Sequence, residues 1–212
     1  NKGLAKFNPL TQSLDTYFYN ENDTNTLSYS NSVMNFEDSQ GRFWVATDLG
    51  LNLFDKNSGK FSDFNEIKTG VNYIVEDKHN NLWIGTRTGL IKYNNGISEK
   101  YFDDISILKL HFDFDGNLWV GTYSVGIYYL DFIHSKILNF ISDDTQSSSL
   151  SNNKVCDFYI SVDKILWIAT YGGGICSFDF NTLNFKYFRR NSNSNNSLAS
   201  NDVFSFYIDQ TQ

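Results

Sequence analysis

The sequence predicts an all-β fold assembled from repeated four-stranded antiparallel units. Aromatic residues make up 17% of the 212 residues, mainly Phe and Tyr, which favour strands. Alternation with a period of two is common, whereas no segment longer than one turn has a clean helical period. One phrase also recurs four times, as GRFWVATDLGLNLFD from Gly41, NNLWIGTRTGLIKYN from Asn80, GNLWVGTYSVGIYYLD from Gly116 and KILWIATYGGGICSFD from Lys164.

The repeated phrase marks the second and third strands of each unit. It is preceded by an alternating run and a tight turn such as SQGR, KHNN or FDGN, and it is followed by an aromatic fourth strand. We expect its Trp to fill the contact between neighbouring sheets and its Gly to open the third strand. These structural positions are Trp44, Trp83, Trp119 and Trp167, with Gly50, Gly89, Gly126 and Gly174.

The spacing of the tryptophans, 39, 36 and 48 residues, is the period of a propeller blade rather than of a helical repeat. Four-stranded antiparallel units repeated radially form a β-propeller. The sequence therefore predicts a single propeller fragment over 1–212, cut from a larger propeller, with four complete and two partial blades. The partial blades are 1–20 and 201–212, and the complete ones are about 31–65, 70–103, 105–141 and 153–189.

Composition excludes several classes of partner and cofactor. The net charge is −7 and there is no Lys/Arg cluster, which argues against nucleic acid and anionic membranes. Cys156 and Cys176 are expected on the first and third strands of one blade, too far apart for a disulfide. The three histidines fall at different places in their units, so we expect no metal site and no cofactor. DFDGN from Asp113 is interpreted as a hairpin turn rather than a calcium loop.

The repeats resemble the two-component regulator propeller repeat, D-x-x-G-N-L-W-I-G-T-x-x-G-L-x-x-Y-N/D. Asp38, Asp77 and Asp113 each precede a Trp by six residues, as that pattern requires. Ser161 stands in place of the Asp six residues before Trp167. The resemblance covers nearly the whole chain, including segments such as SLSNNKV that lead into first strands.

The resemblance implies the periplasmic sensor of a hybrid two-component histidine kinase, with seven-bladed propellers in the full-length protein. Such a sensor recognises an oligosaccharide or polysaccharide breakdown product and regulates genes for glycan use. It also implies a homodimeric full-length protein whose transducing domains and remaining blades are missing from this chain. The segment itself is then not an enzyme.

Candidate ligand residues lie in the loops between second and third strands, here called the platform loops. In a propeller these loops share one face with the segments that lead into first strands. Sugars are bound by aromatic stacking and by planar hydrogen-bonding groups, and Arg also pairs with carboxylates or sulfates. The sequence predicts a ligand site that contains Arg87, Tyr123, Tyr171 and Asp48. The alternative is that these exposed residues have no role because the site lies on missing blades.

Two other functional classes compete with the sensor. Some propellers with similar strands are secreted lyases, but no acid/base pair or His recurs here at a platform position. A propeller that binds a protein and no small ligand is the other alternative, because fold does not fix function. Oligosaccharide affinity without turnover, product formation and a captured protein partner would distinguish the three. We also expect an isolated open arc to associate or to be less stable than a closed propeller.

Overall fold

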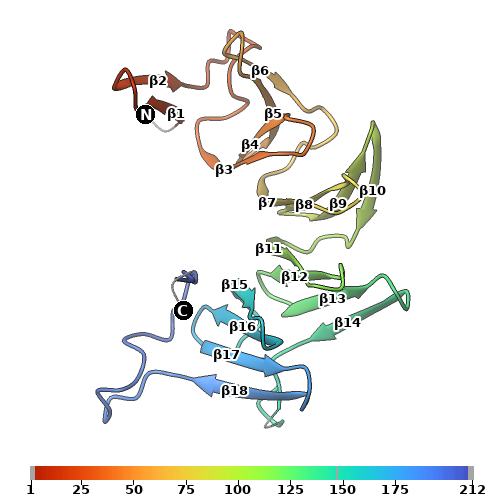
Figure 1. Ribbon diagram of the computed structural model, residues 1–212, viewed down its shortest axis with the longest axis vertical. Coiled ribbons are helices and arrows are strands. Elements are labelled where there is room, and N and C mark those ends of the chain that lie inside the picture. The colour runs from red at the N-terminus through yellow and green to blue at the C-terminus, as the bar shows by residue number, and fades with distance from the viewer. Residues whose placement is uncertain (1–2, 147, 210–212) are drawn as a thin grey trace. The chain divides into compact units, whose positions relative to one another are not determined.

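A computed structural model describes residues 3–146 and 148–209, which form an all-β structure of eighteen strands without a helix (Figure 1). The chain divides into two compact units, Asn1–Asp104 and Ile105–Gln212. They are called the N-terminal and C-terminal units below. Because no helix occurs in the described ranges, none is long and apolar enough to cross a membrane. The continuity of one propeller across both units stays a prediction.

The N-terminal unit contains a hairpin and two four-stranded sheets. The hairpin pairs β1 (Leu4–Asn8) with β2 (Ser13–Tyr17). Blade 1 comprises β3 (Ser32–Glu37), β4 (Phe43–Thr47), β5 (Gly50–Asp55) and β6 (Lys60–Asp63). Blade 2 comprises β7 (Val71–Glu76), β8 (Leu82–Thr86), β9 (Gly89–Asn94) and β10 (Ile97–Tyr101).

The C-terminal unit contains two more sheets of the same kind. Blade 3 comprises β11 (Ile107–Phe112), β12 (Leu118–Thr122), β13 (Ile127–Asp131) and β14 (Lys136–Phe140). Blade 4 comprises β15 (Val155–Ile160), β16 (Ile165–Thr170), β17 (Gly174–Asp179) and β18 (Asn184–Phe188). In all four blades the strands pair antiparallel in sequence order, so each blade is a meander, as the predicted fold class requires.

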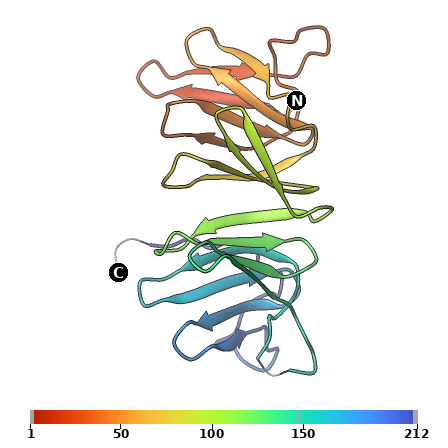
Figure 2. The same cartoon turned by 90° about the vertical axis from the view of Figure 1, so that its right-hand side faces the viewer.

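Within each unit the sheets pack face to face (Figure 2). In the N-terminal unit β7 lies against β3 and β4, and in the C-terminal unit β15 lies against β11 and β12. Apolar residues from both blades of a pair form one cluster, which buries surface that a single sheet would expose. Trp44 belongs to the cluster of blades 1 and 2, and Trp119 to that of blades 3 and 4.

The tryptophans do not all have the same environment. Trp44, Trp83 and Trp119 are buried, as expected for residues between sheets. Trp167 is half-buried and packs at a tilt against Phe188 of its own blade, with ring centroids 5.4 Å apart. Trp44 and Trp119 thus lie in clusters shared by two blades and Trp167 packs within its own blade, and one shared packing role for all four positions stays a prediction.

Three of the four glycines at the start of third strands, Gly89, Gly126 and Gly174, lie where a side chain has no room. A Cβ at Gly126 would lie 2.1 Å from the Phe140 carbonyl oxygen, and at Gly174 it would lie 2.4 Å from that of Phe188. Both glycines have positive φ, 77° and 78°, which other residues adopt rarely. The fourth strand of the blade therefore approaches its third strand closely at this point.

The predicted partial blade at 201–212 is not a strand over its described residues. Residues 203–209 form no ladder, and Asp202 makes only an isolated antiparallel bridge with Tyr171. The segment is instead held to blade 4 by isolated hydrogen bonds. The Val203 N–H donates to the Thr170 carbonyl, and the Phe206 N–H donates to Asp157 Oδ2. A strand needs a partner along its length, and here no described strand continues the pairing. Residues 210–212 lie outside the described residues.

The remaining sequence predictions concern cysteines and one turn. Both cysteines are free, and burial raises the pKa of each thiol, with Cys176 buried and Cys156 half-buried. The DFDGN segment is a hairpin turn in which Asp113 Oδ1 accepts the N–H groups of Asp115 and Asn117, at 3.0 and 2.9 Å. Gly116 takes the positive φ that this turn requires, 82°.

Candidate ligand platform

The four platform loops are built on the same frame. In each blade the Thr that ends the second strand donates its hydroxyl to the carbonyl of the Gly that opens, or directly precedes, the third strand, at 2.7 to 3.0 Å. These threonines are fully buried, so the bond closes the loop without exposing either group. The Thr–Gly pairs are Thr47–Gly50, Thr86–Gly89, Thr122–Gly126 and Thr170–Gly174.

A second recurring bond fixes the residue that follows each Thr. Its N–H donates to the carbonyl of the residue directly before the first strand of the same blade, at 2.9 to 3.2 Å. The two residues therefore lie side by side at the same end of every blade, here called the platform end. The pairs are Asp48 with Asn31, Arg87 with Gly70, Tyr123 with Ser106, and Tyr171 with Lys154.

All four residues predicted for the ligand site occupy this one recurring position. The structure brings them together as two pairs. Asp48 and Arg87 meet in the N-terminal unit, while Tyr123 and Tyr171 meet in the C-terminal unit.

In the N-terminal unit the pair is an ion pair that crosses from one blade to the next. Arg87 Nη2 lies 2.5 Å from Asp48 Oδ1, and Asn31 Nδ2 donates to Asp48 Oδ2 at 2.6 Å. A Cβ at Gly70 would lie 2.7 Å from the Asp48 carbonyl oxygen and 2.8 Å from Arg87 Nε. Glycine before the first strand of blade 2 thus leaves the space through which Arg87 reaches Asp48.

In the C-terminal unit a lysine joins the two tyrosines. The Lys154 ammonium lies 4.5 Å from the Tyr123 ring centroid and 4.2 Å from that of Tyr171, within the range of cation–π attraction. Phe204 packs edge-on against Tyr171, with centroids 5.7 Å apart. Tyr123 and Tyr171 remain 52% and 42% exposed, so much of both rings is open to solvent.

The two pairs differ in how their charge is balanced. The Arg87 charge is matched by Asp48. Over residues 3–146 and 148–209, six ion pairs are formed and none of them includes Lys154. No carboxylate in these ranges therefore lies within ion-pair distance of its ammonium. Aromatic rings attract a cation but carry no net charge, so the ammonium keeps its full positive charge.

Sequence reasoning missed Asn31, Lys154 and Phe204. Lys154 directly precedes the first strand of blade 4, because β15 begins at Val155. Aligning the four blades on their first strands would have placed Asn31, Gly70, Ser106 and Lys154 at one position and so shown that it varies as the platform loops do. No sequence signal links Phe204 to Tyr171.

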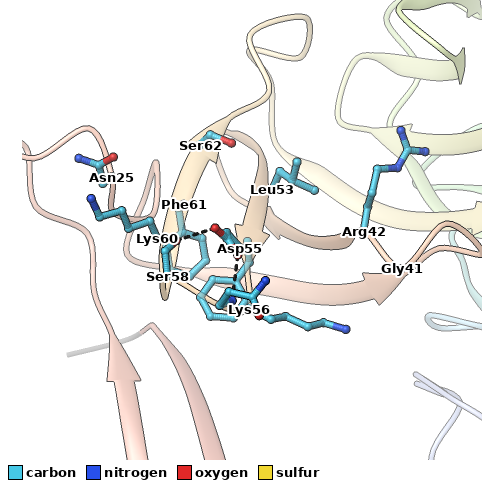
Figure 3. Close-up of a pocket in the computed structure, with 12 residues that line it drawn as sticks. Asn25, Gly41, Arg42, Leu53, Asp55, Lys56, Ser58, Lys60, Phe61 and Ser62 are labelled. Atoms are coloured by element: carbon cyan, nitrogen blue, oxygen red, sulfur yellow. Dashed lines mark hydrogen bonds between the residues drawn. The ribbon is translucent and has the colours of Figure 1, made fainter.

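A pocket lies at the opposite end of blade 1 (Figure 3). This pocket of about 560 Å³ lies between the turn before β4 and the turn that joins β5 to β6. Three of its four charged side chains are already engaged: Arg42 Nε contacts Asp38 at 2.6 Å, Lys56 contacts Glu37 at 2.6 Å, and Asp55 accepts the Ser58 hydroxyl. We therefore regard the platform end as the better candidate site.

No histidine of the described ranges lies at the platform end. His79 and His134 lie in turns, and His111 lies on β11, where burial lowers its pKa. The same ranges contain no group of three or more His, Cys, Asp or Glu side chains placed to hold a metal ion.

Comparison with known proteins agrees with the repeat pattern. The model of the two-component regulator propeller family matches residues 66–88, which run from the end of blade 1 through Thr88. No match was found among curated protein sequences.

Solved structures with the same fold include extracellular domains of two-component systems and an enzyme. The extracellular domain of the hybrid two-component system BT3049 from B. thetaiotaomicron is 26% identical with a TM-score of 0.74, over 94% of this chain and 27% of that one. The corresponding domain of BT4673 is 18% identical with a TM-score of 0.69, over 99% and 35%. Virginiamycin B lyase from Staphylococcus aureus is 12% identical with a TM-score of 0.56, over 76% and 56%.

These comparisons confirm the predicted fold and the predicted resemblance. The chain is a β-propeller segment that carries the two-component regulator propeller repeat, and it resembles the extracellular domains of hybrid two-component systems. It spans about a quarter to a third of the length of those domains.

Proposed function

We propose that this chain is part of the extracytoplasmic, periplasmic sensor of a hybrid two-component system and recognises an oligosaccharide. The proposal is supported by the resemblance to the extracellular domain of BT3049. The complete protein would carry the kinase and regulate genes for glycan use. The segment itself then binds its ligand without changing it.

The observation that carries the ligand proposal is the pair of exposed tyrosines at the platform end of blades 3 and 4. Their rings stand at the same position of neighbouring blades, on loops held by the Thr–Gly and backbone bonds. Exposed aromatic rings bind the apolar faces of sugars, and rigid loops reduce the entropy lost when a ligand binds. Over the described ranges neither phenolic hydroxyl has a hydrogen-bond partner, so both are open to sugar hydroxyls.

The lyase alternative has less support. The likeness to virginiamycin B lyase, at 12% identity, extends to the fold alone. Histidine is the most frequent general acid or base, and the histidines that the structure describes lie away from the platform end.

The test is a calorimetric titration of the chain with neutral and acidic oligosaccharides, followed by chromatography of each mixture. Binding with the sugar recovered unchanged is the expected result. A new sugar product would instead establish a lyase. Absence of binding by every sugar, together with specific capture of a protein, would contradict the proposal in favour of an interaction propeller.

A further inference from the structure

We propose that the Tyr123–Lys154–Tyr171 cluster is an anion subsite that selects acidic sugars through a carboxylate or a sulfate. This inference rests on the proposed function for the sugar and adds the charge of the ligand. Its elements are the position of the ammonium, its unmatched charge and the exposed phenols beside it.

The ammonium is held in place from both ends of the side chain. The Lys154 N–H donates to Asn152 Oδ1 at 2.9 Å, and its carbonyl accepts the Tyr171 N–H at 3.1 Å. At the other end the two ring faces confine the ammonium. A charge confined in this way loses less side-chain entropy on binding than a free surface lysine does.

The acids near Lys154 do not neutralise it. Asp157 lies three residues further along the chain, but its Oδ1 contacts Lys109 Nζ at 2.7 Å and its Oδ2 accepts the Phe206 N–H. Asp202 bridges to the backbone of Tyr171 and forms no ion pair with Lys154. The protein as a whole carries a net charge of −7, and what distinguishes Lys154 is that its ammonium lies against two exposed aromatic rings.

An acidic sugar matches all three elements. A carboxylate or sulfate would accept hydrogen bonds from the Lys154 ammonium, and charge-assisted bonds are the stronger kind. The sugar ring would then lie near the exposed parts of Tyr123 and Tyr171. A neutral sugar of the same shape would lack the ionic contact.

The experiment titrates the chain with two matched pairs of probes. Digalacturonate is compared with its dimethyl ester, and neocarrabiose 4-sulfate is compared with its desulfated form, so that the acidic group is masked or removed while the sugar rings stay the same. The same titrations use Lys154→Met, which keeps the length of the side chain, and Lys186→Met as a control, because Lys186 is exposed on the outer strand β18.

We expect at least one acidic probe to bind about tenfold more tightly than its neutral partner, and Lys154→Met to remove that preference while Lys186→Met keeps it. The acidic probe that binds identifies carboxylate or sulfate as the group. Equal binding of acidic and neutral probes, or an unchanged preference in Lys154→Met, would overturn the anion subsite and leave the proposed function standing. Absence of binding by all four sugars would overturn the anion subsite, whereas the proposed function is contradicted only when the wider set of oligosaccharides in the first titration also fails to bind and a protein is captured instead.

Discussion

At the platform end of blade 2 the Arg87 guanidinium lies against Asp48, whereas at blade 4 the Lys154 ammonium lies between two phenol rings. The backbone frame is the same in both units, so the difference comes from the side chains at two positions. At its platform end the N-terminal unit pairs its cation with a carboxylate. At its platform end the C-terminal unit leaves a cation and two aromatic rings available to a ligand. Polar groups without internal partners are where functional sites are expected.

The same contrast appears at the other end of the blades. Trp44 and Trp83 donate their indole N–H groups to Asp38 and Asp77, at 2.8 and 3.0 Å. Trp119 Nε1 is buried without a partner in the described ranges. In blade 3 the Tyr129 ring packs on Trp119 with centroids 4.5 Å apart, and burial together with the charge of Asp113 raises the pKa of Tyr129. The indole N–H groups of the N-terminal unit therefore have hydrogen-bond acceptors, whereas that of Trp119 in the C-terminal unit has none in the described ranges.

The largest expected effect is a loss of unfolding free energy that differs between the two units. Asp38→Ala removes the acceptor for the Trp44 indole, the Arg42 guanidinium and two backbone N–H groups, at a cost of about 3 kcal/mol in unfolding free energy. Asp113→Ala is the matched variant in blade 3 and costs less, because Trp119 makes no bond to lose. Urea unfolding of both variants measures this, and equal losses would contradict the contrast.

A smaller loss is expected when the space beneath Arg87 is filled. Gly70→Ala places a methyl group against the Asp48 carbonyl and the Arg87 side chain, which costs about 2 kcal/mol through the shifts it forces. Ser106→Ala, at the equivalent position of blade 3, serves as the control and leaves the midpoint of unfolding nearly unchanged. Thermal unfolding of the two variants tests whether Arg87 and the Asp48 backbone approach Gly70 closely. An unchanged midpoint in Gly70→Ala would show that they do not.

Acid should weaken the indole–carboxylate bonds of the N-terminal unit. Burial raises the pKa of Asp38 and Asp77, but hydrogen bonds from the indoles and nearby groups outweigh it, so both pKa values lie below the usual range. Their stabilisation is therefore complete above the unfolded pKa of about 3.9 and is lost as the pH falls through the lower folded values. Unfolding free energy measured from pH 6 to pH 2 should fall less steeply in Asp38→Ala. An identical slope would mean that Asp38 does not contribute.

The smallest expected stability change accompanies a gain of binding. Asp48→Asn removes the charge that matches Arg87 and should cost no more than about 1 kcal/mol, because Arg87 is half exposed. The released guanidinium should give the N-terminal unit a weak affinity for digalacturonate that the unmodified unit lacks. Calorimetry in the Lys154→Met background isolates this site. Failure to gain binding there would mean that charge matching is not what closes the N-terminal platform.

The sequence predicts the frame of this molecule better than its contacts. Repeated Thr and Gly positions locate the platform loops, because their bonds are local within one blade. The Arg87–Asp48 pair joins residues 39 apart on neighbouring blades, and the Lys154 contacts depend on which residue directly precedes β15. Residues 201–209 resemble a first strand in pattern, but pairing decides whether a strand forms, and sequence pattern carries no information about the partner.

The central claim is that ligand recognition belongs to Lys154 and its tyrosines rather than to the matched Arg87. The most direct measurement is a parallel titration of Arg87→Met and Lys154→Met with digalacturonate. The account predicts that Lys154→Met weakens binding about tenfold while Arg87→Met leaves it within about twofold of the unmodified chain. A larger loss in Arg87→Met than in Lys154→Met would contradict it.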